Sequence, residues 1–414
     1  MTTLETETER APARSQHGCL SRTAGVLVLG SDYRALGVAR SLGRRSVTVW
    51  LVRVGDDRLG GLSRYVQRQF AFPPVDPEHQ IDFLLDLAGK YRLEGWVLLP
   101  TADQTAALVS QHHERLALCY RVAVPPWSVL RWAHDKRRTH AVADAVGIPY
   151  PTTHYPCDRS EVETLECAFP AVLKPAIKED FNRLTAAKAW RVDSHEELVA
   201  RYVEACELVD PELLTVQELI PGGGECQLAY GALARNGEVI ASIVAERTRQ
   251  YPMDFGRAST FVRSVDDAEV AALAERVIAQ IGFTGLIEVE FKRDPRDGRC
   301  KLLDLNPRPW GWHTLSARAG VDFPYLLWRM TRGDALPERL RGRPNVSWMR
   351  ISTDLPTSLR EILNGRLSIG AYLSSFRGPR VSAIFSFDDP VPGLLEVPLL
   401  ALVAGRRLAA RGPV

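Results

Sequence analysis

Acidic and amide side chains recur at two-residue spacing in residues 287–308. Glu290 lies in the first half of this segment, and Asp304, Asn306 and Arg308 lie in the second half. In an extended strand, side chains two residues apart share a face, so Asp304 and Asn306 point the same way. Oxygen donors that converge on one face favour a cation between them, and hard donors of this kind suit Mg²⁺, with Mn²⁺ as a substitute.

A β-hairpin is the element that would bring these side chains together. Two runs of alternating apolar residues flank a turn at residues 294–298 that contains Asp, Pro, Arg and Gly. Such a turn between period-2 runs predicts an antiparallel pair of strands. The pairing would place Glu290 beside Asp304 and Asn306. The alternative is a solvated acidic hairpin that binds no metal.

The composition is that of an ordinary globular protein. The chain has 414 residues, of which 45% are hydrophobic and 25% are charged, and its formal net charge is +2. This length predicts two or three domains, and the balanced charge argues against nucleic-acid binding. The 7 cysteines lack metal-binding spacing, and the polar N-terminal stretch lacks the apolar core of a signal peptide. We therefore expect a cytoplasmic protein whose residues 1–24 form a disordered tail.

Lysines are few in this arginine-rich chain, so each one is a candidate for a task that needs a compact ammonium group, such as phosphate binding. Lys174 ends the apolar run 169–176, where a charge without a partner would be costly, and a nucleotide phosphate would supply that partner. Lys136 lies early in the helical pattern of residues 128–147. A basic helix face is the alternative interpretation for Lys136, because two arginines follow it.

Residues 25–127 carry the alternating pattern of an open parallel α/β domain. An apolar strand precedes a helical stretch and a second apolar strand. The glycines after the first strand do not form a G-x-G-x-x-G motif, so dinucleotide binding is not predicted. We expect Gly30, Ser31 and Asp32 to border a substrate cleft at the carboxyl ends of the strands.

Arginines gather between a second predicted hairpin and the helix that follows it. Arg247, Arg249 and Arg257 alternate with aromatic residues, which suits an anionic substrate held by a guanidinium fork. Trp310 and His313, just past the metal strand, complete the candidate substrate residues. The alternatives are a solvated basic loop and, for His313, a hydrogen-bonded structural histidine.

Residues 331–414 do not predict a particular fold. Their last part is an apolar run that Pro398 interrupts and that ends in arginines. The run is too short to span a bilayer. Peripheral contact with an anionic membrane surface, docking on a partner and packing on the chain's own domain all stay open.

The order of these features resembles the ATP-grasp superfamily. The run Asp-Leu-Asn-Pro-Arg at residues 304–308 follows a Glu-Phe pair, as in the metal-binding strand of that superfamily. The resemblance covers roughly residues 130–330 and is nearest to carbamoyl-phosphate synthetase and to D-aspartate ligase-like enzymes. It implies that Glu290, Asp304 and Asn306 bind Mg²⁺. It also implies that Arg308 is catalytic and stabilises the group being transferred.

The same resemblance implies an ATP site. Lys136 and Lys174 would contact the nucleotide. The loop that covers the phosphates in the family is rich in glycine, whereas residues 177–187 of this chain contain none. Lys188 is therefore expected to be among the side chains that hold the phosphates. The hinge strand would hold adenine through Gln217, Glu218, Leu219 and Ile220.

The implied fold class combines α/β and α+β structure. An N-terminal open parallel α/β domain, residues 25–127, would precede a two-lobed ATP-grasp domain with lobes at 128–215 and 216–330 and a C-terminal extension from 331. The implied function is that of an ATP- and Mg²⁺-dependent ligase, which activates a carboxylate as an acyl phosphate and joins it to an amine. The alternatives are phosphorylation of an enol or bicarbonate and a non-catalytic ATP-binding module. Small-molecule substrates and a homodimer are the expected partners.

Overall fold

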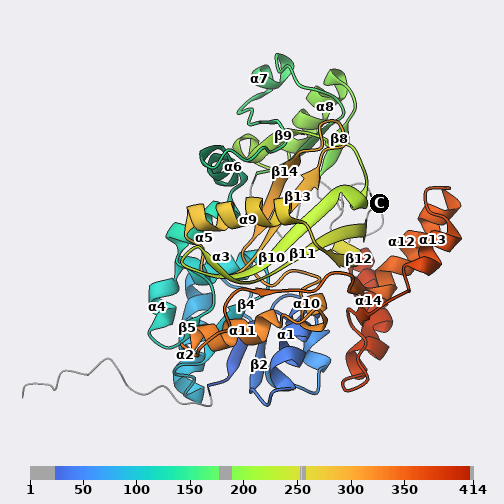
Figure 1. Ribbon diagram of the computed structural model, residues 1–414. Helices are drawn as coiled ribbons and strands as arrows, with labels where there is room; N and C mark the ends of the chain where they lie inside the picture. Colours follow the sequence, from blue (N-terminus) through green and yellow to red (C-terminus); the bar gives the residue numbers. More distant parts are fainter. Residues whose placement is uncertain (1–23, 177–188, 252, 254–257, 411–414) are drawn as a thin grey trace, which may run out of the picture.

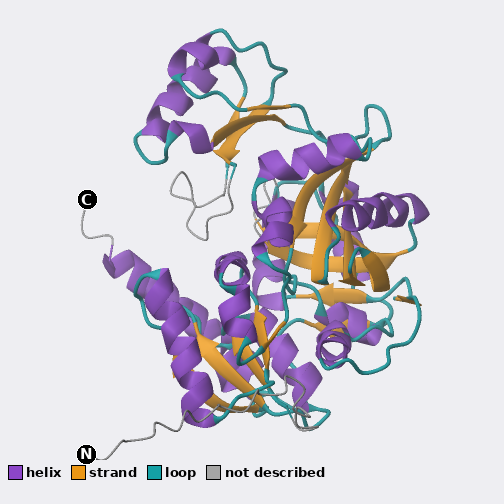
Figure 2. Ribbon diagram, turned by 90° about the vertical axis from the view of Figure 1, so that its left-hand side faces the viewer, coloured by secondary structure: helices purple, strands orange, loops and turns teal. Residues whose placement is uncertain are grey.

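Three β-sheets organise the chain. The computed structural model describes residues 24–176, 189–251, 253 and 258–410 (Figure 1). A four-stranded sheet lies at one end of the molecule, a five-stranded sheet lies at the other, and an eight-stranded sheet lies between them (Figures 1 and 2). Residues 1–23 of the predicted N-terminal tail, Lys188 and Arg257 fall outside the described residues, whereas Ala24, the last residue of that predicted tail, is buried.

The N-terminal sheet is parallel and has the order β3-β2-β1-β4-β5, as predicted for an open α/β domain. Its strands are β1 (Val26–Leu29), β2 (Val49–Arg53), β3 (Val66–Ala71), β4 (Val97–Pro100) and β5 (Arg121–Val122). Its helices are α1 (Tyr33–Gly43), α2 (Pro77–Tyr91), α3 (Asp103–Gln111) and α4 (His113–Ala117). The strand order reverses at β1 and β4, which is where open sheets of this kind bind ligands. Sequence analysis did not predict β3, because its side chains are mostly exposed and polar.

The helix expected over residues 128–147 is two helices. They are α5 (Trp127–His134) and α6 (Lys136–Ala145), and the break falls at Asp135, which has extended φ and ψ of −105° and 123°. The Asp135 carboxylate accepts a hydrogen bond from the Arg137 backbone N–H, which makes it the N-cap of α6. The break makes Lys136 the first residue of a new helix.

The four-stranded sheet is antiparallel, with the order β6-β9-β7-β8. Its strands are β6 (Thr153–His154), β7 (Ala171–Pro175), β8 (Trp190–Val192) and β9 (Leu214–Glu218), covered by α7 (Arg159–Glu163) and α8 (His195–Cys206). The predicted boundary between the lobes at residues 215 and 216 would cut β9. It was wrong, because β9 pairs with β7 along its whole length and therefore belongs to the first lobe.

The eight-stranded sheet follows the order β14-β13-β10-β11-β12-β16-β17, and β15 pairs with β11. Its strands are β10 (Gln227–Arg235), β11 (Glu238–Tyr251), β12 (Ala258–Val265), β13 (Gly285–Arg293), β14 (Cys300–Asn306), β15 (Leu340–Arg341), β16 (Ser347–Met349) and β17 (Arg380–Ser382). Helix α9 (Ala268–Ile281) packs on β10 and β11, and its buried side joins the core beneath the sheet. The first arginines of the basic segment lie on β11 rather than in a loop.

The residues after 331 do not form a separate unit. Their strands β15, β16 and β17 extend the large sheet, so this segment completes the second lobe. The helices of this segment are α12 (Ile351–Leu363), α13 (Ile369–Ser374) and α14 (Val391–Ala410), and two helices precede it, α10 (Thr314–Arg318) and α11 (Phe323–Thr331). Among the described residues, no helix combines the length and the apolar character needed to cross a bilayer.

Candidate functional site

The predicted hairpin is confirmed as β13 and β14, and its register aligns the acidic residues. Glu290 pairs with Asp304, and Glu288 pairs with Asn306. The Asn306 Nδ2 group donates hydrogen bonds to Glu290 Oε1 at 2.8 Å and to Glu288 Oε2 at 3.0 Å. One amide therefore bridges two carboxylates, which shows that Glu290, Glu288 and Asn306 share a face of the sheet.

Each of the two candidate metal-binding carboxylates has a cationic partner. Arg247 Nη1 lies 2.5 Å from Glu290 Oε2, and Lys136 Nζ lies 3.1 Å from Asp304 Oδ1. Arg247 and Lys136 are themselves buried. These ion pairs neutralise carboxylates that would otherwise repel one another in a poorly solvated place.

Glu288 is a site residue that sequence analysis did not assign. It is buried, and Trp312 Nε1 donates a hydrogen bond to its Oε1 at 2.7 Å. Burial, followed by the negative charge of Glu290, raises the pKa of Glu288 to about 7. The sequence feature that could have identified Glu288 was its position two residues before Glu290 on the same strand.

Arg308 joins the hairpin to the N-terminal domain. Its Nη2 and Nε groups donate hydrogen bonds to Asp103 Oδ2 at 2.8 and 3.1 Å, and Nη2 also donates to Asn306 Oδ1 at 3.1 Å. Asp103 opens α3, directly after the carboxyl end of β4. The carboxyl end of β4, one of the strand ends where a cleft was predicted, therefore lies next to Arg308. Asp103 was not among the predicted site residues, since its partner lies 205 positions away in the sequence.

Lys174 and Gln217 contact each other on the four-stranded sheet. Lys174 Nζ donates a hydrogen bond to Gln217 Oε1 at 2.5 Å, and Gln217 Nε2 donates to Thr153 Oγ1 at 2.7 Å. Gln217 is buried and Lys174 is half-buried. The amide oxygen thus fixes the ammonium group at the end of β7.

His140 lies near Lys136 and Lys174, the two lysines predicted to contact the nucleotide. It is buried, stacks on Tyr150 with a centroid distance of 4.1 Å, and its Nδ1 lies 2.7 Å from the Tyr155 hydroxyl. Burial, followed by the positive charges of Lys136 and Lys174, lowers the pKa of His140 to about 3. A neutral imidazole therefore adds no further charge beside the two lysines.

The predicted adenine-binding residues have protein partners. Glu218 forms ion pairs with Arg296 and with Lys301. The carbonyl oxygen of Ile220 accepts a hydrogen bond from Lys292 Nζ at 2.7 Å, and the Leu219 N–H donates to a carbonyl oxygen at 3.2 Å. Lys292 thus links the predicted adenine-binding segment, residues 217–220, to β13.

The predicted substrate residues do not lie together. Arg247 lies at the hairpin, but Arg249 forms a buried two-pronged ion pair with Asp354 of α12, with both contacts at 2.9 Å. Trp310 lies in the core, where its ring packs so closely on Gly231 that a Cβ there would lie 2.1 Å from the indole. His313 is also buried, and its Nδ1 lies 2.8 Å from the Trp310 carbonyl oxygen.

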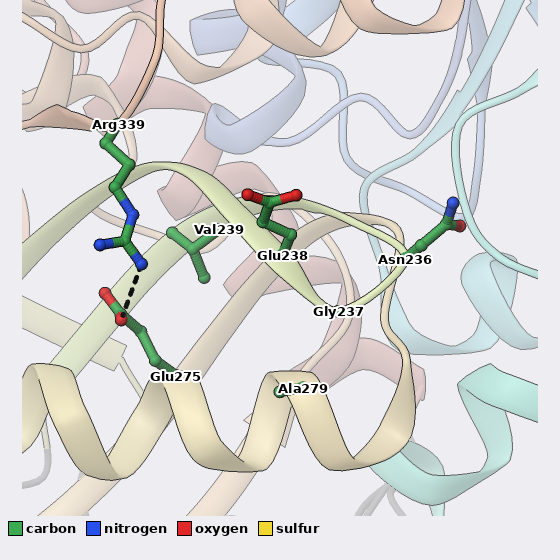
Figure 3. Close-up of a pocket in the computed structure, with 7 residues that line it drawn as sticks. All are labelled: Asn236, Gly237, Glu238, Val239, Glu275, Ala279 and Arg339. Carbon is green, nitrogen blue, oxygen red and sulfur yellow. Dashed lines mark ion pairs between the residues drawn. The ribbon is translucent and has the colours of Figure 1, made fainter.

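A separate hollow of about 380 Å³ lies away from the hairpin face (Figure 3). It is lined by the turn between β10 and β11, by one side of α9 and by Arg339, which forms an ion pair with Glu275 at 3.8 Å. None of the predicted site residues lines this hollow. It therefore does not bear on the candidate site.

The donor set on the hairpin fits Mg²⁺ when nucleotide phosphates supply further ligands. Among the described residues, no group of three or more His, Cys, Asp or Glu side chains is arranged to hold a metal on its own. Mg²⁺ usually takes one or two carboxylates from the protein, and Glu290 and Asp304 provide two. Coordination by the Asn306 oxygen would require a half-turn of its amide, because that oxygen now faces Arg308.

Comparison with known proteins shows which proteins this chain resembles. Residues 216–352 match the family described as "ATP-grasp in the biosynthetic pathway with Ter operon". The chain is 23% identical to a D-aspartate ligase from Enterococcus faecium over 299 residues, which is 68% of this chain and 70% of that protein. It is 26% identical over 182 residues to the C-terminal section of the carbamoyl phosphate synthase large chain from Methanopyrus kandleri, which is 42% of this chain and 32% of that protein.

The fold is also found among solved structures. An L-amino acid ligase from Bacillus licheniformis superposes with a TM-score of 0.61 at 14% identity, covering 76% of each chain. The fold and the site thus define a protein with an ATP-grasp domain preceded by an open α/β domain. The match of residues 216–352 to an ATP-grasp family, together with the similarity to the D-aspartate ligase and the carbamoyl phosphate synthase section, supports the resemblance to the ATP-grasp superfamily that the hairpin predicted.

Proposed function

We propose that this protein is an ATP- and Mg²⁺-dependent ligase that joins a carboxylate to an amine. The D-aspartate ligase and the L-amino acid ligase, which this chain resembles, support a substrate pair of this kind. The observation that carries the proposal is the hairpin register, which sets Glu290 opposite Asp304 and brings Asn306 and Arg308 to the same place.

The reaction would proceed in two steps. A carboxylate oxygen bonds to the γ-phosphorus of ATP, and the bond from that phosphorus to its bridging oxygen breaks, so that ADP leaves with the electron pair. The amine nitrogen then bonds to the acyl carbon, phosphate leaves, and the amine gives up a proton. Bound Mg²⁺ would neutralise the phosphate oxygens during the first step.

The residues of the chain supply position and charge. Glu290 and Asp304 would hold the metal, and the positive charges of Arg247 and Lys136 beside them would attract the anionic substrates. Lys174, held by Gln217, would bind a phosphate. Arg308 would stabilise the negative charge of the transferring group, because Asp103 and Asn306 hold its guanidinium at the end of the hairpin. Positioning of this kind requires no side-chain nucleophile.

The test is release of ADP over a panel of carboxylates and amines with Mg²⁺. A ligase releases ADP and phosphate only when both a carboxylate and an amine are present. Release with bicarbonate or an enol alone would identify the alternative reaction, and ATP binding without release under any pairing would identify a binding module. Both outcomes contradict the proposal.

A matched pair of variants links turnover to the hairpin. Glu290→Gln removes a metal-binding charge and should lower the release of ADP at least about 100-fold, as expected when a ligand to a catalytic metal is lost. Glu238→Gln changes an exposed carboxylate on β11 of the same sheet and should leave the rate unchanged. Near-normal activity of Glu290→Gln would refute the assignment of the metal site.

A further inference from the structure

Helix α12 presents its apolar side to solvent and its polar side to the protein. Its buried residues are all polar: Asp354, Thr357, Ser358 and Glu361. Its exposed side carries Ile351, Leu355, Leu359 and Leu363 at four-residue spacing, and these side chains are 47%, 52%, 54% and 78% exposed. A surface helix of a globular protein normally has the opposite arrangement, with the apolar stripe facing the core. The stripe therefore indicates an apolar partner.

Two neighbouring helices also carry exposed apolar side chains. On α13, Ile369 and Leu373 are 63% and 61% exposed, and on α14, Leu394 is 67% exposed. We call the four apolar residues of α12 and these three residues the C-terminal apolar surface. Helices α12, α13 and α14 lie together at one side of the molecule (Figure 1). Several exposed apolar side chains on helices that lie together indicate an interaction site.

The C-terminal helices are fixed to the body of the protein. Asp354 on the inner side of α12 binds the buried Arg249 of β11, and Thr260 Oγ1 donates to the same carboxylate at 2.8 Å. Glu396 of α14 accepts hydrogen bonds from Arg350 Nε at 2.8 Å and from Ser352 Oγ at 2.6 Å. The apolar stripe of α12 therefore faces outward because polar contacts hold the opposite side of this helix against the protein.

Most exposed charges on the segment that carries this surface are positive. The carboxylates of Asp354, Glu361 and Glu396 are buried in ion pairs with arginines. Among the described residues from 351 to 402, the exposed acid is Asp388, which binds Arg44 of the N-terminal domain. The exposed cations of this segment are Arg360, Arg377 and Arg380, together with Arg366, whose charge Glu361 balances. The sequence continues with further arginines at positions 406, 407 and 411.

Positive charge beside exposed apolar side chains indicates which kind of partner binds the C-terminal apolar surface. A two-fold dimer through this surface would place each patch against itself and bring arginines toward arginines. A membrane surface rich in anionic lipids offers acyl chains to the leucines and negative headgroups to the arginines. We propose that the C-terminal apolar surface docks the protein on an anionic membrane surface. The contact is peripheral, since no described helix meets the requirements for spanning a bilayer.

The test is flotation of the full-length protein with vesicles. Vesicles of equal parts phosphatidylcholine and phosphatidylglycerol should carry the protein with them, whereas vesicles of phosphatidylcholine alone should carry at least about tenfold less. The variant Leu355→Ser/Leu359→Ser/Leu363→Ser should bind the anionic vesicles at least about tenfold more weakly. These side chains are exposed, so the melting temperature and ATP turnover should not change.

Two further variants separate the contributions to binding. Leu118→Ser/Leu208→Ser removes exposed leucines from other faces, which are 84% and 41% exposed, and should bind vesicles like the wild type. Arg360→Glu/Arg377→Glu should lose the preference for anionic lipid. Equal binding by the triple serine variant and the wild type, or a wild type that ignores anionic vesicles, would overturn the proposal. A dimer that forms without lipid and dissociates in the triple variant would overturn it as well.

Discussion

Replacing Asp103 with Asn tests whether the N-terminal domain positions Arg308, the arginine that we propose is catalytic. Asp103 Oδ2 accepts both hydrogen bonds that Arg308 makes across the domain boundary, at 2.8 and 3.1 Å. The two side chains are only 15% and 12% exposed, so water screens the pair weakly. Asparagine keeps the shape of the side chain and one oxygen but removes the negative charge.

The size of the effect follows from the strength of these bonds. A hydrogen bond to a charged group contributes about 1.5–3 kcal/mol. If this contribution positions Arg308 for the transition state, its loss lowers kcat by about 10- to 100-fold. The KM for ATP should change by less than about twofold, because loss of an interaction made only in the transition state appears in kcat. The nucleotide lysines lie on other elements, α6 and β7.

The assay is steady-state ADP release with Mg²⁺ and saturating substrates, together with the melting temperature of each variant. Asp103→Glu restores the charge and should recover part of the rate. Glu78→Gln is the control, since Glu78 is also an acid in the first turn of a helix of this domain and also binds an arginine, Arg115. A melting temperature that falls while kcat and KM both stay at wild-type values would refute the positioning role and leave a purely structural ion pair.

Three other predictions concern charge. Chelation of the metal should abolish turnover but leave the melting temperature unchanged, because Arg247 and Lys136 already neutralise the metal-binding carboxylates. Burial and the nearby lysines hold the pKa of His140 at about 3, whereas the pKa in the unfolded chain is about 6.5. The unfolded chain therefore binds a proton more readily, so the folded protein loses stability as the pH falls below about 6.5. Urea titrations should show this loss at up to about 1.4 kcal/mol per pH unit, and His140→Gln should remove it whereas His79→Gln, at an exposed position, should not. Asp354→Asn leaves a buried guanidinium without its anion and should lower the free energy of unfolding by about 3–5 kcal/mol; a loss under about 1 kcal/mol would contradict the structural role of this pair.

Local patterns were sufficient to predict the metal hairpin. Alternation of apolar and polar residues sets which side chains share a face, and the turn chemistry at residues 294–298 sets the chain reversal, so the pairing of Glu290 with Asp304 could be predicted. The parallel N-terminal sheet was predictable for a similar reason, since β1 and β4 are short apolar runs separated by helical stretches. Each of these signals depends on residues close together in the sequence.

Strand β11 shows where local patterns fail. Arg247 and Arg249 are two residues apart and were expected to serve one substrate site. The pairing of β11 with β12 is irregular between Glu246 and Gln250, and the two guanidinium groups bind different partners, Glu290 and Asp354. The sequence around the two arginines could not show that they bind different partners, because the irregular register depends on how β11 pairs with β12.

The sequence by itself thus determined the class of site: two carboxylates, an amide and an arginine on a hairpin, with lysines on preceding elements. Only the tertiary structure decided which residues complete it. Asp103 reaches Arg308 across 205 positions of sequence, and Glu288 acquires its raised pKa only when the packed sheet removes water from around it. The outward apolar stripe of α12 is likewise a tertiary result, because ion pairing with Arg249 turns the polar side of this helix inward.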